Sequence, residues 1–284
     1  MYSKSFLAVL CLAASAIAQA GGAESRPTSQ PLVTVSEDEA ETILREVDAR
    51  IYRPRDHGLK DLQCVWRCKG DGALASVDFM IKFAWRAPYA ERIEVLSADG
   101  KPMTEVPKLL REQKPNYIAE QVEGMKALVY TRVIGLRLAD VYADYYKKVS
   151  KREVNNKIET RIEMTPRKKK LFSKIVLKLR DGLPYEEIKS RDSGVDLHIL
   201  HNYAKEGELF LPKLFHSEVE NRLMTEEELY YVAVDGILLA TSLERRSAQD
   251  GIKGVQKVVL EDVQANKGLP DSMFKAPEKP GEVK

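Results

Sequence analysis

Few residues in this sequence have both the type and the spacing that chemistry requires. His198 and His201, in HILH, come nearest to a metal-ligand pair. Residues three apart in a strand point to opposite faces, so the two imidazoles are not expected to share one ion. The sequence contains no Gly-x-Ser-x-Gly elbow, no His-Glu-x-x-His pair and no Walker loop. We therefore expect no enzyme activity, no metal and no cofactor; the enzymatic alternative is an exported hydrolase whose catalytic residues are scattered along the chain.

The pair Cys64 and Cys68, in CVWRC, raises the question of a disulfide. If this stretch is a strand, its four-residue step spans about 13 Å, whereas a disulfide needs Cα atoms within roughly 7 Å. We expect free thiols on an apolar face, while a turn at this place would instead allow a disulfide. The spacing fits neither a redox Cys-x-x-Cys pair nor a zinc site without further ligands.

The densest basic cluster is PRKKK at residues 166–170. Its simplest interpretation is a solvated hairpin tip, and its functional interpretation is a contact for anionic head groups or an acidic partner. The whole chain has 45 Lys and Arg against 43 Asp and Glu, a formal charge of +2. This balance gives no electrostatic argument for a nucleic acid partner.

The N-terminal residues 1–20 have the pattern of a secretory signal peptide. A lysine near the start is followed by an apolar run from Phe6 to Ile17 and by Ala-Gln-Ala ending at Ala20. We expect cleavage after Ala20 and export to the periplasm. The apolar run is too short for a permanent transmembrane helix, and no later stretch is long and apolar enough. Residues 21–35 are small and polar with two prolines, so they are expected to form a flexible leader.

The rest of the chain alternates between helical and strand patterns. A helix is predicted from a capping box at Ser36 and Glu39 to Pro54, and three strands are predicted near 59–68, 73–85 and 89–97. A mostly helical block follows, and its second helix is predicted in LRLADVYADYYKKV. After residue 150 almost everything alternates as strand, with turns predicted at Asp181-Gly182, Asp192-Ser193-Gly194, Glu206-Gly207, Asp235-Gly236 and Asp250-Gly251. About ten strands with short turns predict an α+β fold with one curved antiparallel sheet and helices on its concave face; a two-sheet sandwich is the main alternative.

Four apolar stripes mark the inward faces of the predicted strands. The longest includes five large residues in strict alternation, which is typical of a half-buried strand. The pattern shows which side is dry but does not distinguish an ordinary core from a ligand cavity. The candidate cavity residues are Val77, Phe79, Ile81, Phe83, Trp85, Ile158, Ile162, Ile175, Leu177, Leu197 and Ile199.

Five segments in order resemble the bacterial outer-membrane lipoprotein carrier family, the LolA/LolB-like lipoprotein-sorting proteins. They are AETILREVDARI, IKFAWRAPYAERIEV with SADGK, LADVYADYYKKVSKREVNNKIETRIEMTPRKK, FSKIVLKLRDGLPYEEIKSRDSG and KGLPDSMFKAPEKPGEV. Together they span most of residues 37–283. The resemblance implies a single half-barrel domain over 36–284, an unclosed β-barrel with a helical lid block near 104–149.

The same resemblance implies a function without covalent chemistry. The protein would be a periplasmic carrier that binds an acyl chain of a lipid or lipoprotein, with a membrane-associated donor or acceptor as partner. The alternative is a lipid- or lipoprotein-sensing regulatory protein of the same fold. The resemblance places Arg86 and Pro88 at the lid turn. The family has an Arg directly before this Pro, whereas here that residue is Ala87, which puts Arg86 on the opposite face of the strand.

Overall fold

The computed structural model describes residues 36–69, 74, 76–154, 156–220, 222–249 and 252–275. The predicted signal peptide, the leader and the tail from residue 276 onward lie outside these residues, as does the predicted turn at Asp250-Gly251. No helix in the described part of the chain is long and apolar enough to cross a membrane.

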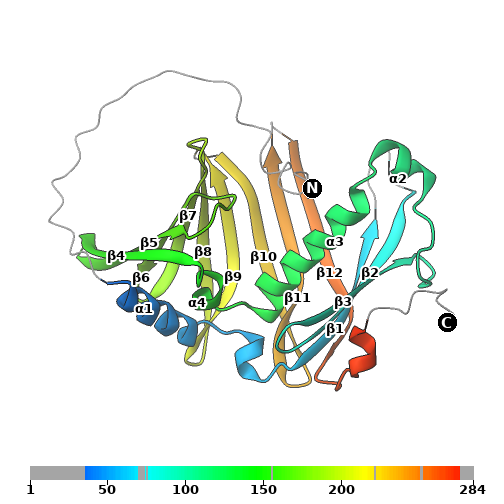
Figure 1. Cartoon of the computed structure of the whole chain (residues 1–284), viewed down its shortest axis with the longest axis horizontal. Coiled ribbons are helices and arrows are strands. Elements are labelled where there is room, and N and C mark those ends of the chain that lie inside the picture. Colours follow the sequence, from blue (N-terminus) through cyan, green and yellow to red (C-terminus); the bar gives the residue numbers. More distant parts are fainter. Residues whose placement is uncertain are drawn as a thin grey trace, which may run out of the picture. The chain divides into compact units, whose positions relative to one another are not determined.

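Within the described residues, twelve strands form one antiparallel sheet, in the order β3-β2-β1-β12-β11-β10-β9-β8-β7-β6-β5-β4 (Figure 1). The order ends at β3 and β4, so the sheet is open. The predicted α+β class with an unclosed antiparallel sheet is confirmed, with twelve strands in place of about ten. The strands are β1 (Asp61–Lys69), β2 (Asp78–Arg86), β3 (Ala90–Ser97), β4 (Tyr145–Val154), β5 (Lys157–Pro166), β6 (Lys174–Arg180), β7 (Leu183–Ser190), β8 (Asp196–Glu206), β9 (Leu209–Val219), β10 (Arg222–Val234), β11 (Ile237–Gln249) and β12 (Ile252–Ala265).

The helices of the described part of the chain are few and mostly short, and they lie at three places along it. The first precedes β1, the main group lies between β3 and β4, and the last follows β12. They are α1 (Glu37–Arg50), η2 (Pro54–His57), α2 (Lys108–Gln113), α3 (Tyr117–Leu128), the π-helix η4 (Val129–Ile134), α4 (Leu138–Val141) and η5 (Asp271–Phe274).

The chain divides into two compact units, each built from separate stretches of sequence. Among the described residues, unit 1 comprises 36–53, 135–230 and 243–257, and unit 2 comprises 54–134, 231–242 and 258–275. Strands β10, β11 and β12 therefore contribute residues to both units. Each unit has its own cluster of buried apolar side chains.

In unit 1, α1 packs on the face of the sheet formed by β4, β5 and β6 (Figure 1). Its buried residues Ala40, Leu44 and Val47 recur at helical spacing, as an amphipathic helix requires. Ser36 precedes the helix in an extended conformation but makes no side-chain bond to it, so the predicted capping box is not formed. The helix ends at Arg50, before Pro54, as predicted.

The predicted second helix in the lid block is wrong over most of its length. Only Leu138–Val141 is helical, and β4 begins at Tyr145. From Tyr145 the buried residues alternate with exposed ones through Lys147 and Val149, which is a strand period. Tyrosine and valine favour a pleated surface, and pairing with β5 over the whole strand overrides the helical spacing of the preceding residues.

Candidate functional site

The apolar stripe of β2 is fully buried in unit 2. Its five side chains are 3% exposed or less, and three of them are fully enclosed. The alternation of the strand puts the four residues from Phe79 to Trp85 on one face, as the sequence predicted, and Val77 directly precedes the strand. We call these residues the β2 stripe: Val77, Phe79, Ile81, Phe83 and Trp85.

One mainly helical segment of unit 2, residues 117–134, packs on the β2 stripe, and we call it the roof. It consists of α3 followed directly by η4. Tyr117 meets Phe79 edge to face with ring centroids 6.3 Å apart, and Tyr130 meets Phe83 in the same way at 6.0 Å. The roof also buries Met125, Val129, Val133 and Ile134 in the same cluster. Helical side chains, rather than a second sheet, therefore cover this face of β2.

A polar contact, which we call the clasp, ties the roof to the edge strand β3. The Tyr130 hydroxyl donates to the Glu91 carboxylate at 2.7 Å, and Lys126 Nζ lies 2.8 Å from the same carboxylate. Burial would raise the pKa of Glu91, but the bonds from Lys126 and Tyr130 outweigh it and lower that pKa. Lys126 and Glu91 are 29% and 32% exposed, so the clasp lies at the rim and opens into water.

The indole N–H of Trp85 is a polar group inside the apolar cluster. It is buried and has no hydrogen-bond partner among the described residues. A buried donor without a partner costs about 1–3 kcal/mol. An oxygen atom of a ligand that reached this depth would remove that cost.

Cys64 and Cys68 lie on the same apolar face of β1 and are free, buried thiols, as the strand geometry predicted. Burial raises the pKa of Cys64 to about 12, and burial together with the charge of Asp78 raises the pKa of Cys68 to about 12. Because the thiolate is the reactive form, both are expected to resist alkylation at neutral pH. Mass spectrometry of the labelled protein should show neither Cys64 nor Cys68 modified in the native state and both modified after denaturation; rapid labelling of either residue in the native state would contradict this burial.

The remaining candidate cavity residues lie in unit 1 and do not act as one group. Ile162, Ile175 and Leu177 belong to the cluster beneath α1. Leu197 and Ile199, on β8, are half-buried and belong to neither cluster. Ile158 is 68% exposed, so the predicted inward orientation is wrong for this residue. It lies at the hairpin end of β5 opposite Glu153, which is itself exposed.

Arg86 and Pro88, the predicted lid-turn residues, lie where β2 ends. Arg86 donates to the Leu269 carbonyl at 2.9 Å and pairs with Asp271 at 2.5 Å, while its guanidinium lies 4.9 Å from the centroid of the Phe274 ring. Pro88 follows Ala87 in the turn. These contacts attach Arg86 to the segment after β12 rather than to the roof.

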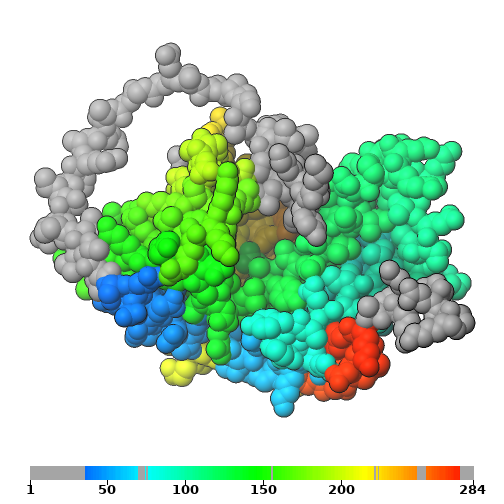
Figure 2. Space-filling view, viewed as in Figure 1, coloured from blue at the N-terminus to red at the C-terminus, as the bar shows by residue number. Residues whose placement is uncertain are grey.

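The same C-terminal segment borders an open pocket of about 300 Å³ on the face of β2 and β3 opposite the stripe. Arg92 pairs with Glu94 at 2.5 Å and donates to the Met273 carbonyl at 2.8 Å, which holds η5 over the pocket. Figure 2 shows η5 (red) at the surface beside the cyan β2–β3 hairpin. The lining of the pocket mixes polar and apolar side chains, among them Lys82, Ala84 and Pro270. This is not the environment that an acyl chain requires.

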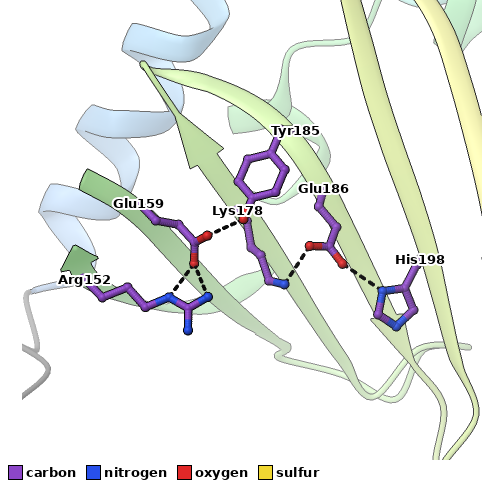
Figure 3. A network of polar contacts seen from close by, with 6 residues as sticks. All are labelled: Arg152, Glu159, Lys178, Tyr185, Glu186 and His198. Atoms are coloured by element: carbon purple, nitrogen blue, oxygen red, sulfur yellow. Dashed lines mark hydrogen bonds and ion pairs between the residues drawn. The ribbon is translucent and has the colours of Figure 1, made fainter. Parts of the chain in front are cut away.

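Unit 1 carries a polar network on the face of its sheet opposite α1 (Figure 3). Glu159 accepts bonds from Arg152, at 2.7 Å, and from Tyr185. Glu186 binds Lys178 at 2.6 Å and His198 at 2.8 Å. His201 lies on the other face beside Glu187, so the two histidines point to opposite sides, as predicted. No described group of side chains could hold a metal ion.

The network should make stability depend on pH on the acid side. Burial would raise the pKa of Glu159 and of Glu186, but the bonds from Arg152 and Tyr185, and from Lys178 and His198, outweigh it and lower both. A carboxyl with a lowered folded-state pKa contributes stability that is present above its ordinary pKa and lost as pH falls through the lowered one. Melting temperatures measured below neutral pH should fall less steeply in Glu159→Gln than in the wild type; equal slopes would exclude this contribution.

Sequence reasoning missed a buried ion pair in unit 1. Arg53 Nη2 lies 2.6 Å from Asp48, with the two side chains 5% and 6% exposed. The Asp48 carboxylate also accepts from the amides of Leu138 and Ala139 at 2.8 and 3.0 Å, which caps α4. Arg53 in turn donates to the Leu136 carbonyl at 3.0 Å. The Asp48–Arg53 pair therefore holds in place the segment from Leu136 to Ala139, which follows the roof in sequence.

The fold and this site define an α+β protein with an open antiparallel sheet and a helix-covered apolar interior. No protein-family model and no curated protein matches the sequence. Among solved structures, the chain is similar to an outer membrane lipoprotein-sorting protein domain from Vibrio parahaemolyticus. The identity is 10% over 84% of this chain and 97% of that chain, with a TM-score of 0.36. The sequence motifs resemble the same class of protein.

Proposed function

We propose that the protein binds one acyl chain of a lipid or lipoprotein without covalent chemistry, between the β2 stripe and the roof, and carries it through an aqueous compartment. The observation that supports this most is the roof itself. A surface of aromatic and aliphatic side chains is covered by a short helical segment that is attached at the rim by the clasp. This arrangement lets one surface be covered either by the roof or by a ligand.

The energies of the contacts fit an exchange of this kind. Burying a chain of about twelve methylenes gains roughly 9–10 kcal/mol. Each edge-to-face aromatic pair is worth about 0.5–1.5 kcal/mol beyond its buried area, and an ion pair at the surface about 0–1 kcal/mol. The apolar side chains of the roof would then cover the bound chain instead of the stripe. The free energy gained by burying the acyl chain therefore exceeds the cost of moving the roof away from the β2 stripe, if the ligand fills the space that the roof leaves.

Trp85 is a built-in reporter for the test. Bromine quenches indole emission on contact, so a dodecanoic acid brominated at its far end should quench Trp85 if the chain enters the interior. Trp66, the other tryptophan, is replaced in a Trp66→Phe variant so that emission comes from Trp85 alone. We expect saturable quenching by the brominated acid and none by the plain acid. Absence of quenching, together with no mass shift in native mass spectrometry, would sink the proposal.

Loosening the clasp supplies a second arm of the test. Tyr130→Phe removes the hydroxyl bond to Glu91 while keeping the ring contact with Phe83. We expect quenching of Trp85 to become several-fold faster, because a bond of this kind contributes on the order of 1–3 kcal/mol. Tyr89→Phe is the matched control, since Tyr89 is 72% exposed and lies outside the roof. Equal rates with and without Tyr130→Phe in the Trp66→Phe background would show that the clasp does not control ligand entry.

Export belongs to the same proposal. A carrier of this kind acts after cleavage at Ala20, and the intact mass of the protein purified from the periplasm tests it directly. The sensing alternative uses the same acyl site but requires a membrane partner that responds to ligand. Capture of such a partner only in the presence of the acyl ligand would favour sensing over carriage.

A further inference from the structure

The connection between β5 and β6 in unit 1 presents consecutive exposed residues of two kinds. Arg167, Lys168, Lys169 and Lys170 supply positive charge, and Leu171, 52% exposed, supplies an apolar side chain. We call residues 167–171 the basic loop.

The charge of the basic loop is mostly uncompensated. Arg167 pairs with Glu37 at the start of α1. Within the described residues, none of the three lysines has an ion-pair partner. Lys170 Nζ lies 4.4 Å from the centroid of the Tyr145 ring, and the Lys170 side chain is exposed.

The backbone at both ends of the basic loop is fixed. The Arg167 amide donates to the Asp144 carbonyl at 2.9 Å, and the Ser173 amide donates to the Ser190 carbonyl at 3.0 Å. These bonds hold the loop in place at the ends of β5 and β6. The cations are therefore presented from a defined edge of unit 1.

Aromatic side chains surround the base of the loop. Tyr146 is 56% exposed and carries the Arg167 guanidinium 4.2 Å from its ring centroid. Phe172, next to Leu171, is half-buried and has Lys189 and Arg191 over its ring at 5.9 and 5.7 Å. Tyrosine is a typical residue of the membrane–water interface, where its ring lies among head groups.

We propose that the basic loop docks the protein on the surface of an anionic lipid bilayer, with the lysines among the head groups and Leu171 inserted below them. Lysines near an anionic surface add binding energy without defined geometry, and an exposed leucine adds apolar burial. A site for an acidic protein would instead favour arginine forks and a packed aromatic centre, because lysine is depleted from such interfaces. This proposal is independent of acyl-chain binding, since the loop lies in unit 1 and the roof in unit 2.

The test is co-sedimentation of the mature protein with vesicles, without any acyl ligand. We expect binding to phosphatidylcholine vesicles that contain phosphatidylglycerol, loss of binding in high salt, and weak binding to phosphatidylcholine alone. Replacing Lys168, Lys169 and Lys170 together by Gln should lower the partition coefficient roughly 100-fold, at about fivefold per lysine. Leu171→Ala should lower it several-fold while leaving the salt dependence unchanged.

A charge-matched control separates the loop from the net charge of the protein. Lys101, Lys108 and Lys205 are exposed lysines elsewhere in the chain, and replacing them by Gln changes the net charge equally. This control should bind vesicles nearly as well as the wild type, and thermal melting checks that both triple variants are folded. Equal loss in both variants, or no binding of the wild type to anionic vesicles, would overturn the proposal. Binding to polyglutamate in place of vesicles would overturn it in favour of an acidic protein partner.

Discussion

Asp48→Ala is expected to lower the free energy of unfolding by about 3–5 kcal/mol, since removing one partner of a buried ion pair leaves the other charge uncompensated. Arg53 would then lose the Asp48 carboxylate, which lies 2.6 Å from its guanidinium. The amides of Leu138 and Ala139 would also lose their acceptor. Urea-induced unfolding followed by circular dichroism measures the change.

Two further variants test whether the lower free energy of unfolding of Asp48→Ala comes from the broken ion pair. Asp38→Ala removes an exposed carboxyl from the same helix and should change the free energy of unfolding by less than about 0.5 kcal/mol. The double variant Asp48→Ala with Arg53→Met removes both charges and should be more stable than Asp48→Ala alone, because no unpaired charge remains buried. If the double variant lost as much free energy of unfolding as the two single substitutions added together, the two residues would not act as a pair.

Phe83→Glu is expected to unfold unit 2. Truncating a buried Phe costs about 3–5 kcal/mol, and burying an unpaired carboxylate adds several more, so the sum approaches the whole stability of a typical domain at about 5–15 kcal/mol. Phe83 is fully enclosed and its ring meets Tyr130 at 6.0 Å. A red shift of Trp85 emission in the Trp66→Phe background measures the loss of packing.

The matched control is the same substitution on the other face of β2. Met80 is half-buried there and lies opposite Arg67 on β1, so a glutamate at this position gains an opposite charge. Met80→Glu should keep Trp85 emission native-like and change stability by less than about 1 kcal/mol. A folded Phe83→Glu protein with native emission would contradict the enclosed packing of the β2 stripe.

Local patterns predicted most of the fold. The strict alternation of the β2 stripe located a buried face, and the Asp-Gly and Glu-Gly pairs located the turns between β6 and β7, between β8 and β9 and between β10 and β11. The error in the lid block has a physical cause. Leu138, Val141 and Tyr142 have helical spacing, but the next residues gain more from pairing with β5 than from a longer helix.

The candidate site was predicted less completely. The stripe showed one side of the interior, whereas the roof and the clasp depend on contacts between residues far apart in sequence, such as Glu91 and Tyr130. Asp48 and Arg53 carried a weak local signal, because an acidic residue sits next to Val47 on the apolar side of a helix. Their partners at Leu138 and Ala139 have no sequence pattern that would have indicated them.

The pairing of β1 with β12 has a consequence for the order of folding. Leu62 lies opposite Ala265, and the Asp61 carboxylate accepts from the amides of Lys267 and Gly268 at 2.8 and 3.0 Å. Strands β4 to β9 each pair with their neighbour in sequence, so they close short loops and can form as soon as they are made. The first strand must wait for the last. Unit 2 is therefore completed only when the chain has been made through β12. Until then the β2 stripe lacks its full sheet and is at risk of aggregation.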